Sequence, residues 1–263
     1  MLNGSVEVNM VSSQHPDATE IGRLDGKVVV ITGASKGIGK ATATVFAAAG
    51  AKVVLAARTR ETLEQVAEEL SVGGVSNPDS ILAVPTDVTN IDAVKRLIQR
   101  TLDTYQQVDI LVNNAGVGHF GPVVDFDPDN WDTVLNSNLK AIYLCAKYAL
   151  PSMLARGDGQ IINVLSIAAK VAFEASGAYC AAKAGALALT KVLASEVRQQ
   201  NIRVTAVLPG SVHTPFWDGV PQHPDFEQML TPEHVADTII SVCQQPPGMV
   251  TEEIVVMPPL GIL

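Results

Sequence analysis

The chain has 263 residues, of which 47% are hydrophobic and 17% charged, and a formal net charge of −9. Its length and apolar content suit one domain with a large core. The negative charge argues against nucleic acid and anionic membranes as partners, since both require a basic surface. The three cysteines have no paired or metal-type spacing, which predicts a reduced, cytoplasmic setting. No apolar run is long enough to predict a membrane span. The five histidines form no metal-like cluster, so we expect no metal.

The first 23 residues are polar and irregular, without the apolar core of a signal peptide. We expect residues 1–23 to form a flexible tail and residues 24–263 to form a single domain. The sequence leaves open two alternatives for this tail: residues added to the natural chain, or a segment that contacts a partner.

From Lys27 onward, short aliphatic runs alternate with longer helical stretches, which predicts a parallel sheet with helical crossovers. The runs are nearly continuous rather than alternating, as expected for strands covered on both faces. Strands are expected at 28–32, 52–57, 81–86, 109–113, 160–165, 203–208 and 253–257. Helices are expected at 38–49, 59–70, 90–104, about 128–155, about 178–200 and 232–244. The predicted fold class is α/β, a doubly wound, seven-stranded parallel sheet with helices on both faces and its ligand at the carboxyl ends of the strands.

The first expected strand leads directly into a glycine-containing loop that opens a helix. Glycines here allow a tight turn and a close approach of the backbone to a pyrophosphate, and the helix N-terminus supplies free N–H groups. An ordinary turn between a strand and a helix is the alternative. The candidate phosphate-binding residues are Gly33, Ser35, Lys36, Gly37, Ile38 and Gly39.

The loop has the spacing T-G-x-x-x-G-x-G and is followed by further motifs in a defined order. These are Asn113-Asn114-Ala115-Gly116, Asn138, Ser166, Tyr179-Cys180-Ala181-Ala182-Lys183, and Pro209-Gly210 with Val212 and Thr214. Over residues 24–214 this arrangement resembles the short-chain dehydrogenase/reductase family. The resemblance implies a Rossmann-type domain that transfers a hydride between a nicotinamide cofactor and a carbonyl compound or secondary alcohol. One departure is Leu165, which stands where many relatives have a further serine.

The end of the second expected strand bears on the choice of cofactor. An NAD enzyme usually places a carboxylate there to bind the ribose 2′-hydroxyl, but this chain has Ala57 followed by Arg58. Arg58 and Lys36 are suited to a 2′-phosphate through charge-assisted hydrogen bonds, which predicts NADP(H). Solvated surface charges are the alternative.

The resemblance implies further cofactor contacts after three later strands. For Asp87, capping of the helix that follows is the alternative to the implied adenine contact. The implied contacts are Asp87 and Val88 for the adenine, Asn114, Ala115 and Gly116 beside the glycine loop, and Val212 and Thr214 for the nicotinamide carboxamide.

Tyr179 and Lys183 lie four residues apart on an expected helix, so their side chains project from one face. A phenol has a pKa of about 10, and a nearby ammonium together with oxidised nicotinamide favours the phenolate. Lowering the pKa of Tyr179 to about 7 would take roughly 4 kcal/mol. By resemblance, Tyr179 is the general acid/base and Lys183 also holds the nicotinamide ribose. Ser166 then binds the substrate oxygen, and Asn138 holds a water for proton relay. Taken singly, the tyrosine and serine are equally compatible with packing and capping.

The substrate end is less defined by the sequence. Five residues could form an apolar entrance to the site, and ordinary loop packing is the alternative. They are His119, Phe120, Phe173, Phe216 and Trp217. The substrate is expected to be a small-molecule carbonyl compound or alcohol. The tail lacks the Val-Asp-Gly-Gly turn of many relatives, which leaves a homodimer and a homotetramer open.

Three functions remain in competition: a reductase, an alcohol dehydrogenase working oxidatively, and a non-catalytic NADP-binding sensor or scaffold. The complete Ser166–Tyr179–Lys183 set favours an enzyme. The expected NADP(H) preference favours reduction.

Overall fold

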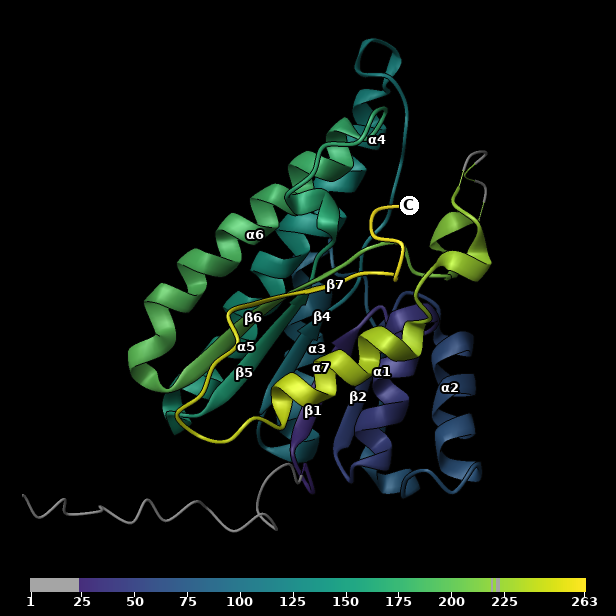
Figure 1. Cartoon of the computed structure of the whole chain (residues 1–263). Coiled ribbons are helices and arrows are strands. Elements are labelled where there is room, and N and C mark those ends of the chain that lie inside the picture. The colour runs from purple at the N-terminus through teal and green to yellow at the C-terminus, as the bar shows by residue number, and fades with distance from the viewer. Residues whose placement is uncertain (1–23, 219, 221–222) are drawn as a thin grey trace, which may run out of the picture.

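The computed structural model describes residues 24–218, 220 and 223–263, so the tail predicted for residues 1–23 lies outside the described residues. Seven strands form one parallel sheet in the order β3-β2-β1-β4-β5-β6-β7 (Figure 1). The predicted α/β, doubly wound sheet is therefore confirmed. The strands are β1 (Val28–Thr32), β2 (Lys52–Ala57), β3 (Ile81–Pro85), β4 (Ile110–Asn113), β5 (Gly159–Val164), β6 (Ile202–Pro209) and β7 (Glu253–Val256).

The central strands form because their side chains find apolar partners on both faces. Every residue of β1, β4 and β5 is buried, which explains their continuous apolar sequences. The strand order reverses between β1 and β4, where the chain leaves the β3 side of the sheet and continues toward β7. A crevice opens at such a reversal, outside the carboxyl ends of the strands.

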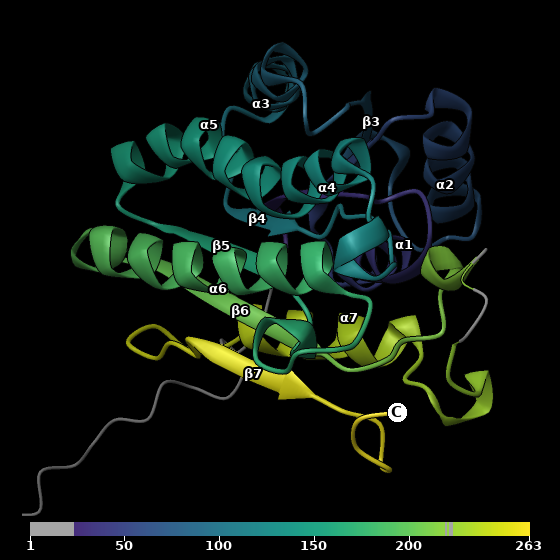
Figure 2. The same cartoon turned by 90° about the horizontal axis from the view of Figure 1, so that it is seen from above.

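Helices cover both faces of the sheet (Figures 1 and 2). Helices α1, α2 and α7 contribute Phe46, Leu63 and Ile239 to the core on one face. Helices α3, α5 and α6 pack on the other face. Among the described residues, no helix is long and apolar enough to cross a membrane. The bounds are α1 (Gly37–Ala48), α2 (Arg60–Val72), α3 (Ile91–Tyr105), α4 (Pro128–Leu135), α5 (Ala141–Arg156), α6 (Gly177–Val197) and α7 (Pro232–Cys243).

The single helix expected at about 128–155 is wrong in one respect. A π turn over Asn136–Lys140 separates α4 from α5. Asn138 lies inside this turn, and its Nδ2 donates to the carbonyl oxygens of Val134, at 2.9 Å, and Val117, at 2.8 Å. A side chain that bonds into the backbone ladder in this way accompanies a local widening of the helix.

The starts of β4 and α3 each differ from expectation by one residue, and at both places a side chain accepts a backbone N–H. Strand β4 begins at Ile110 instead of 109, where the Asp109 carboxylate accepts the N–H of Val28 at 2.7 Å. Helix α3 begins after Asn90, whose Oδ1 accepts the N–H of Ala93 at 2.9 Å, as expected for an N-cap.

Candidate active site

A cavity of about 600 Å³ lies at the carboxyl ends of the central strands. It is the place where the strand order predicts a ligand. Five of the candidate residues lie outside its lining: Ser35, Gly39, Arg58, Asp87 and Val88. The structure brings thirteen candidates together on its walls, namely Gly33, Lys36, Gly37, Ile38, Asn114, Ala115, Gly116, Asn138, Ser166, Tyr179, Lys183, Val212 and Thr214.

The loop between β1 and α1 needs its glycines for geometric reasons. Gly33 has a φ of +68°, which favours glycine, and a Cβ there would lie 2.9 Å from Nδ2 of Asn114. A Cβ on Gly39 would overlap the carbonyl oxygen of Gly33. Helix α1 begins at Gly37 with no side-chain cap on its first N–H groups. These N–H groups therefore remain available to an anion.

Asn114 fastens this loop to the end of β4. Its Nδ2 donates to the carbonyl oxygens of Thr32, at 3.0 Å, and Gly33, at 3.3 Å. The Thr32 hydroxyl in turn accepts the N–H groups of Asn114 and Ala115, at 3.0 and 3.1 Å. Sequence reasoning assigned Asn114 to the cofactor and missed this second role, which holds the two sides of the crevice together.

The cations expected near a 2′-phosphate are exposed and lie near the same edge of the sheet. Arg58 directly follows β2, and neither Arg58 nor Lys36 forms an ion pair with another described residue. Lys40 differs from them, because it is paired with Glu69. Ala57, at the end of β2, brings no negative charge to this edge.

Asp87 is exposed after β3, and its Oδ1 accepts from the N–H and the hydroxyl of Thr89 at 2.9 and 2.7 Å. Helix α3 is capped by Asn90 instead, so the alternative of Asp87 as the helix cap is not observed. Val88 is buried beside it.

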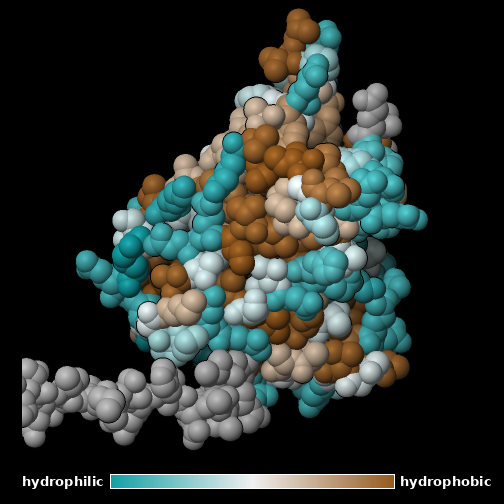
Figure 3. All heavy atoms as spheres, in the orientation of Figure 1, coloured by the Kyte–Doolittle hydropathy of each residue, from teal (hydrophilic) through white to brown (hydrophobic). Residues whose placement is uncertain are grey.

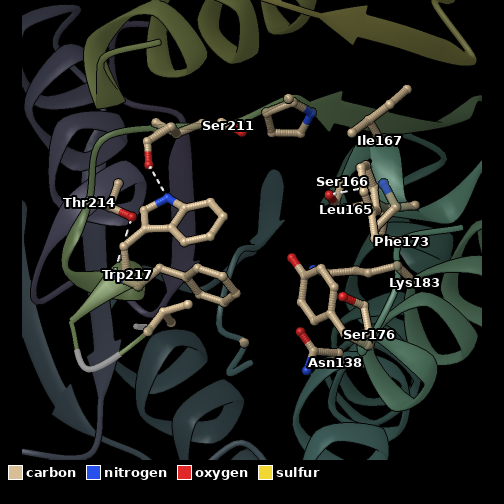
Figure 4. Close-up of a pocket in the computed structure, with 18 of the residues that line it drawn as sticks. Asn138, Leu165, Ser166, Ile167, Phe173, Ser176, Lys183, Ser211, Thr214 and Trp217 are labelled. Atoms are coloured by element: carbon tan, nitrogen blue, oxygen red, sulfur yellow. Dashed lines mark hydrogen bonds between the residues drawn. The ribbon is translucent and has the colours of Figure 1, made fainter. Parts of the chain in front are cut away.

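Tyr179 and Lys183 project into the cavity from the first turns of α6. The Lys183 Nζ lies 5.5 Å from the centroid of the Tyr179 ring and donates to the carbonyl oxygen of Val164 at 3.3 Å. Figure 4 shows Lys183 on the same side of the cavity as Ser166 and Asn138. The helical spacing thus places the phenol and the ammonium together, as the sequence predicts.

Burial favours the uncharged form of both Tyr179 and Lys183. Burial raises the pKa of Tyr179 to about 12, while the hydrogen-bonding Ser166 hydroxyl opposes this rise. Burial lowers the pKa of Lys183 to about 8. Without a cofactor, burial dominates: the surrounding side chains exclude water from the phenol, so the pKa of Tyr179 lies above its ordinary value. At neutral pH the phenol is protonated.

Ser166 follows β5, where its Oγ accepts the N–H of Ala168 at 3.1 Å. Asn138 is buried, and its Oδ1 has no partner among the described residues. A Cβ on Gly116 would lie 2.5 Å from this oxygen and 3.8 Å from Lys183 Nζ. The Asn138 Oδ1 and the Lys183 Nζ therefore both lie close to Gly116. Because Oδ1 has no hydrogen-bond donor, it suits a bound group that would bridge it to Lys183.

Aromatic side chains enclose the phenol. The rings of Phe120 and Phe216 lie 5.8 and 5.6 Å from the Tyr179 ring, measured between centroids. Trp217 is fixed beside them because its Nε1 donates to the carbonyl oxygen of Val212 at 3.0 Å. Four of the five residues expected at an apolar entrance line the cavity, namely Phe120, Phe173, Phe216 and Trp217, whereas His119 does not.

Sequence reasoning missed the contribution of the C-terminal segment. Met257, Ile262 and Leu263 line the same cavity as Tyr179. The signal that predicts a chain reversal here is Pro258-Pro259-Leu260-Gly261, since proline and glycine occupy favoured turn positions. No group of three or more His, Cys, Asp or Glu residues that could hold a metal ion occurs in the described part of the chain.

Comparison with known families gives one match over most of the chain. Residues 27–225 match the family described as short chain dehydrogenase. The chain belongs to the short-chain dehydrogenase/reductase family. The chain is 37% identical to an uncharacterised oxidoreductase of Staphylococcus haemolyticus, over 89% of its own length and 98% of the relative. An uncharacterised oxidoreductase of Staphylococcus aureus is also 37% identical, with the same shares of both chains.

Solved structures of the family resemble this short-chain dehydrogenase closely. The alcohol dehydrogenase of Thermococcus sibiricus, complexed with 5-hydroxy-NADP, has a TM-score of 0.80 and 28% identity. That likeness covers 88% of this chain and 96% of the other. A metagenomic short-chain oxidoreductase in complex with NADP has a TM-score of 0.78 and 35% identity, over 90% of this chain and 98% of the other. The protein is therefore an oxidoreductase of this family.

Proposed function

We propose that this oxidoreductase uses NADPH to reduce the carbonyl group of a small molecule to a secondary or primary alcohol, with Tyr179 as the proton donor. The observation that carries the proposal is the joint position of Ser166, Tyr179 and Lys183 on one cavity, next to the glycine loop of β1 and α1. Packing or capping alone does not require these three side chains to meet beside a phosphate-type cradle.

Three features of the chain fit NADP(H). The uncapped N-terminus of α1 and the close contact of Gly33 with Gly39 leave backbone N–H groups for a pyrophosphate. Arg58 and Lys36 are cations without an ion pair in the described residues, which suits a 2′-phosphate. Two structural neighbours, at 28% and 35% identity, are complexes with 5-hydroxy-NADP and NADP.

Bound NADPH would supply the hydride that reduces the carbonyl carbon. The chain's own residues would then act on the carbonyl oxygen. Ser166 and Tyr179 donate hydrogen bonds to this oxygen, which stabilises the negative charge that develops as the carbonyl is reduced. Tyr179 gives up its proton to the oxygen, and the adjacent Lys183 ammonium stabilises the resulting phenolate. The unpartnered Oδ1 of Asn138 lies near Lys183, where it can accept a hydrogen bond from a water that passes a proton to Lys183.

The proton that reduction requires is already on Tyr179 at neutral pH. A phenol with a pKa of about 12 holds its proton at neutral pH and is ready to donate it. Oxidation of an alcohol is the reverse of this step and begins with the phenolate, which the Lys183 ammonium stabilises. An alcohol dehydrogenase acting oxidatively uses the same residues and remains the second candidate.

NADPH consumption tests the proposal against a panel of ketones, aldehydes and 3-oxoacyl thioesters, with wild type and Tyr179→Phe compared. We expect wild type to consume NADPH with part of the panel and Tyr179→Phe to be nearly inactive. Tight NADPH binding without turnover of any compound, in either direction, would instead support a non-catalytic sensor or scaffold. Equal activity of the variant would remove Tyr179 from its proposed role.

We also propose a homodimer or homotetramer. Helices α5 and α6 run side by side (Figure 2) and carry the exposed apolar side chains Tyr143, Leu154 and Val192. Apolar side chains on adjacent helices suit a contact between copies of the chain. Light scattering at micromolar concentration tests this proposal, and a monomer would refute it.

A further inference from the structure

Apolar side chains from distant segments line the cavity together with Tyr179. Phe173 follows β5, Trp217 follows β6, and Ile262 and Leu263 come from the end of the chain. Figure 3 shows that hydrophobic side chains also gather on the outer face that carries this C-terminal segment. Leu260 and Ile262 are among them, with 69% and 51% of their surface exposed.

A turn brings the C-terminal segment back to the cavity. The N–H of Gly210 donates to the carbonyl oxygen of Val256 at 2.8 Å, which fixes the end of β7 beside β6. The N–H of Gly261 then donates to the carbonyl oxygen of Pro258 at 2.9 Å, and Gly261 has a φ of +83°. Proline within this turn and glycine at its end favour the reversal. Ile262 and Leu263 are thereby returned to the cavity, on the wall that Met257 also lines.

The charges around the cavity disfavour an anionic substrate. Among the described lining residues, three have charged side chains: Lys36, Lys183 and Glu174. Lys36 belongs to the glycine loop, and Lys183 is committed to Tyr179 and the carbonyl oxygen of Val164. Glu174, an exposed residue beside Phe173, adds a negative charge at the rim. The net charge of −9 adds further repulsion of an approaching anion.

We infer that the substrate is an uncharged, apolar carbonyl compound, and that Ile262 and Leu263 are specificity-determining residues that contact its apolar body. This inference rests on the proposed carbonyl reductase function and names the substrate class of the same site. Besides Ser166 and Tyr179, the polar side chains on the cavity walls include uncharged hydroxyl groups such as those of Ser176 and Ser211. A carboxylate or phosphate elsewhere on the substrate would lose part of its hydration against Phe173, Trp217 and Leu263 without gaining a charged partner.

Methyl 4-acetylbenzoate and 4-acetylbenzoate form a matched pair that tests the charge requirement. They share the ketone and the ring, and the carboxyl group lies on the far side of the ring from the reacting carbonyl. Their intrinsic reactivities are normalised by their rates of reduction with borohydride. With NADPH, we expect the neutral ester to have a kcat/KM about 100-fold above that of the acid. The reason is that a buried carboxylate without a charged partner lowers the affinity of the site for the substrate by about 100-fold.

Two lysine substitutions in the C-terminal segment test the location. Ile262→Lys places a cation on the cavity wall, and Leu260→Lys places the same charge on an exposed residue that does not line the cavity. We expect Ile262→Lys to raise the acid-to-ester ratio of kcat/KM by about tenfold or more, because the cation offers the carboxylate a partner. Leu260→Lys, which changes the net charge equally, should alter the ratio by less than about threefold.

The possible outcomes separate this inference from the proposed function. Absence of NADPH consumption with every carbonyl compound refutes the proposed function itself. Reduction of the acid as well as the ester, or of only charged or sugar-like carbonyl compounds, retains the reductase and overturns the apolar substrate class. Equal effects of Ile262→Lys and Leu260→Lys would show that overall charge, and not the cavity wall, sets the preference.

Discussion

The two halves of the crevice are built in different ways. The cofactor half, around β1, β4 and the start of α1, is formed mainly by backbone, with glycines at close contacts and Asn114 fastening one loop to the other. The substrate half is formed by side chains from the loops after β4, β5 and β6 and from the C-terminal segment. Backbone recognition fits a constant ligand, whereas side chains can change with the substrate while the frame stays the same.

Tyr179 and Lys183 join these halves. Both stand on α6, whose first turns face the substrate side, while Lys183 reaches the end of β5 through its bond to Val164. Changes in the cofactor half should therefore act on coenzyme affinity and folding. Changes in the substrate half should act on turnover and specificity. The following predictions test this division, from the largest expected effect to the smallest.

Tyr179→Phe should lower kcat by about 1,000-fold, since general acid catalysis contributes roughly two to four decades. The ring and its contacts with Phe120 and Phe216 are retained, so the Kd for NADPH should stay within about threefold of wild type. Steady-state kinetics and fluorescence titration with NADPH measure the two quantities. A parallel loss of NADPH affinity would show that the two halves are not separable at this residue.

Gly39→Ala should lower the free energy of unfolding by about 3 kcal/mol, because its Cβ would overlap the carbonyl oxygen of Gly33 in a tightly packed loop. Gly177→Ala is the matched control at the start of α6, where a Cβ meets only the exposed side chain of Val123, at 3.3 Å. We expect the control to change stability by less than about 1 kcal/mol. Urea unfolding measures both. Equal losses would contradict the rigid role of the glycine loop.

Arg58→Ala should weaken NADPH binding by roughly ten- to a hundredfold and leave NADH binding nearly unchanged, since only NADPH carries the 2′-phosphate. Arg60→Ala is the control, because Arg60 is a neighbouring exposed cation that pairs with Glu64 at 3.4 Å. Adding Ala57→Asp to Arg58→Ala should invert the preference in kcat/KM. Loss of both coenzymes on Arg58→Ala, or an equal effect of Arg60→Ala, would make Arg58 an ordinary surface charge.

Lys183→Met should raise the free energy of unfolding at pH 7 by roughly 1–2 kcal/mol, once the loss of the hydrogen bond to Val164 is subtracted. The physical reason is that folding buries an ammonium whose pKa falls from 10.5 to about 8. The unfolded state binds this proton more tightly, so the penalty is full below pH 8 and is relieved as the pH rises toward 10.5. The advantage of the variant should therefore shrink between these values. A less stable variant at pH 7 would show that the ammonium stabilises the fold.

The sheet and the glycine loop were predictable because their signals are local. Buried parallel strands produce continuous apolar runs, and a phosphate-type turn needs glycine at fixed spacing. The pairing of Tyr179 with Lys183 was predictable for the same reason, since a four-residue spacing on a helix fixes a common face. These features depend on neighbours in the sequence.

The remaining features depend on contacts between distant segments. The pKa of Tyr179 is raised by burial among side chains such as Phe120 and Phe216, which the helical spacing does not determine. Ile262 and Leu263 reach the cavity only because β7 closes against β6 before the final turn. The π turn escapes a search for helical periodicity, since one extra residue hardly alters the apolar pattern of a long helix.

That extra residue also controls the relative rotation of two helices. Each residue of a regular α-helix turns the chain by about 100°, so the π turn between α4 and α5 offsets their faces. As a result, Val134 of α4 packs on Ala178 and Ala182 of α6. Leu144 of α5 packs instead in the core between the sheet and the helices α3, α5 and α6. Removing one residue from 136–140 would turn α4 away from α6 and carry Asn138 out of reach of Val117. The length of this stretch, as well as its side chains, is therefore part of what aligns the candidate proton path with Tyr179.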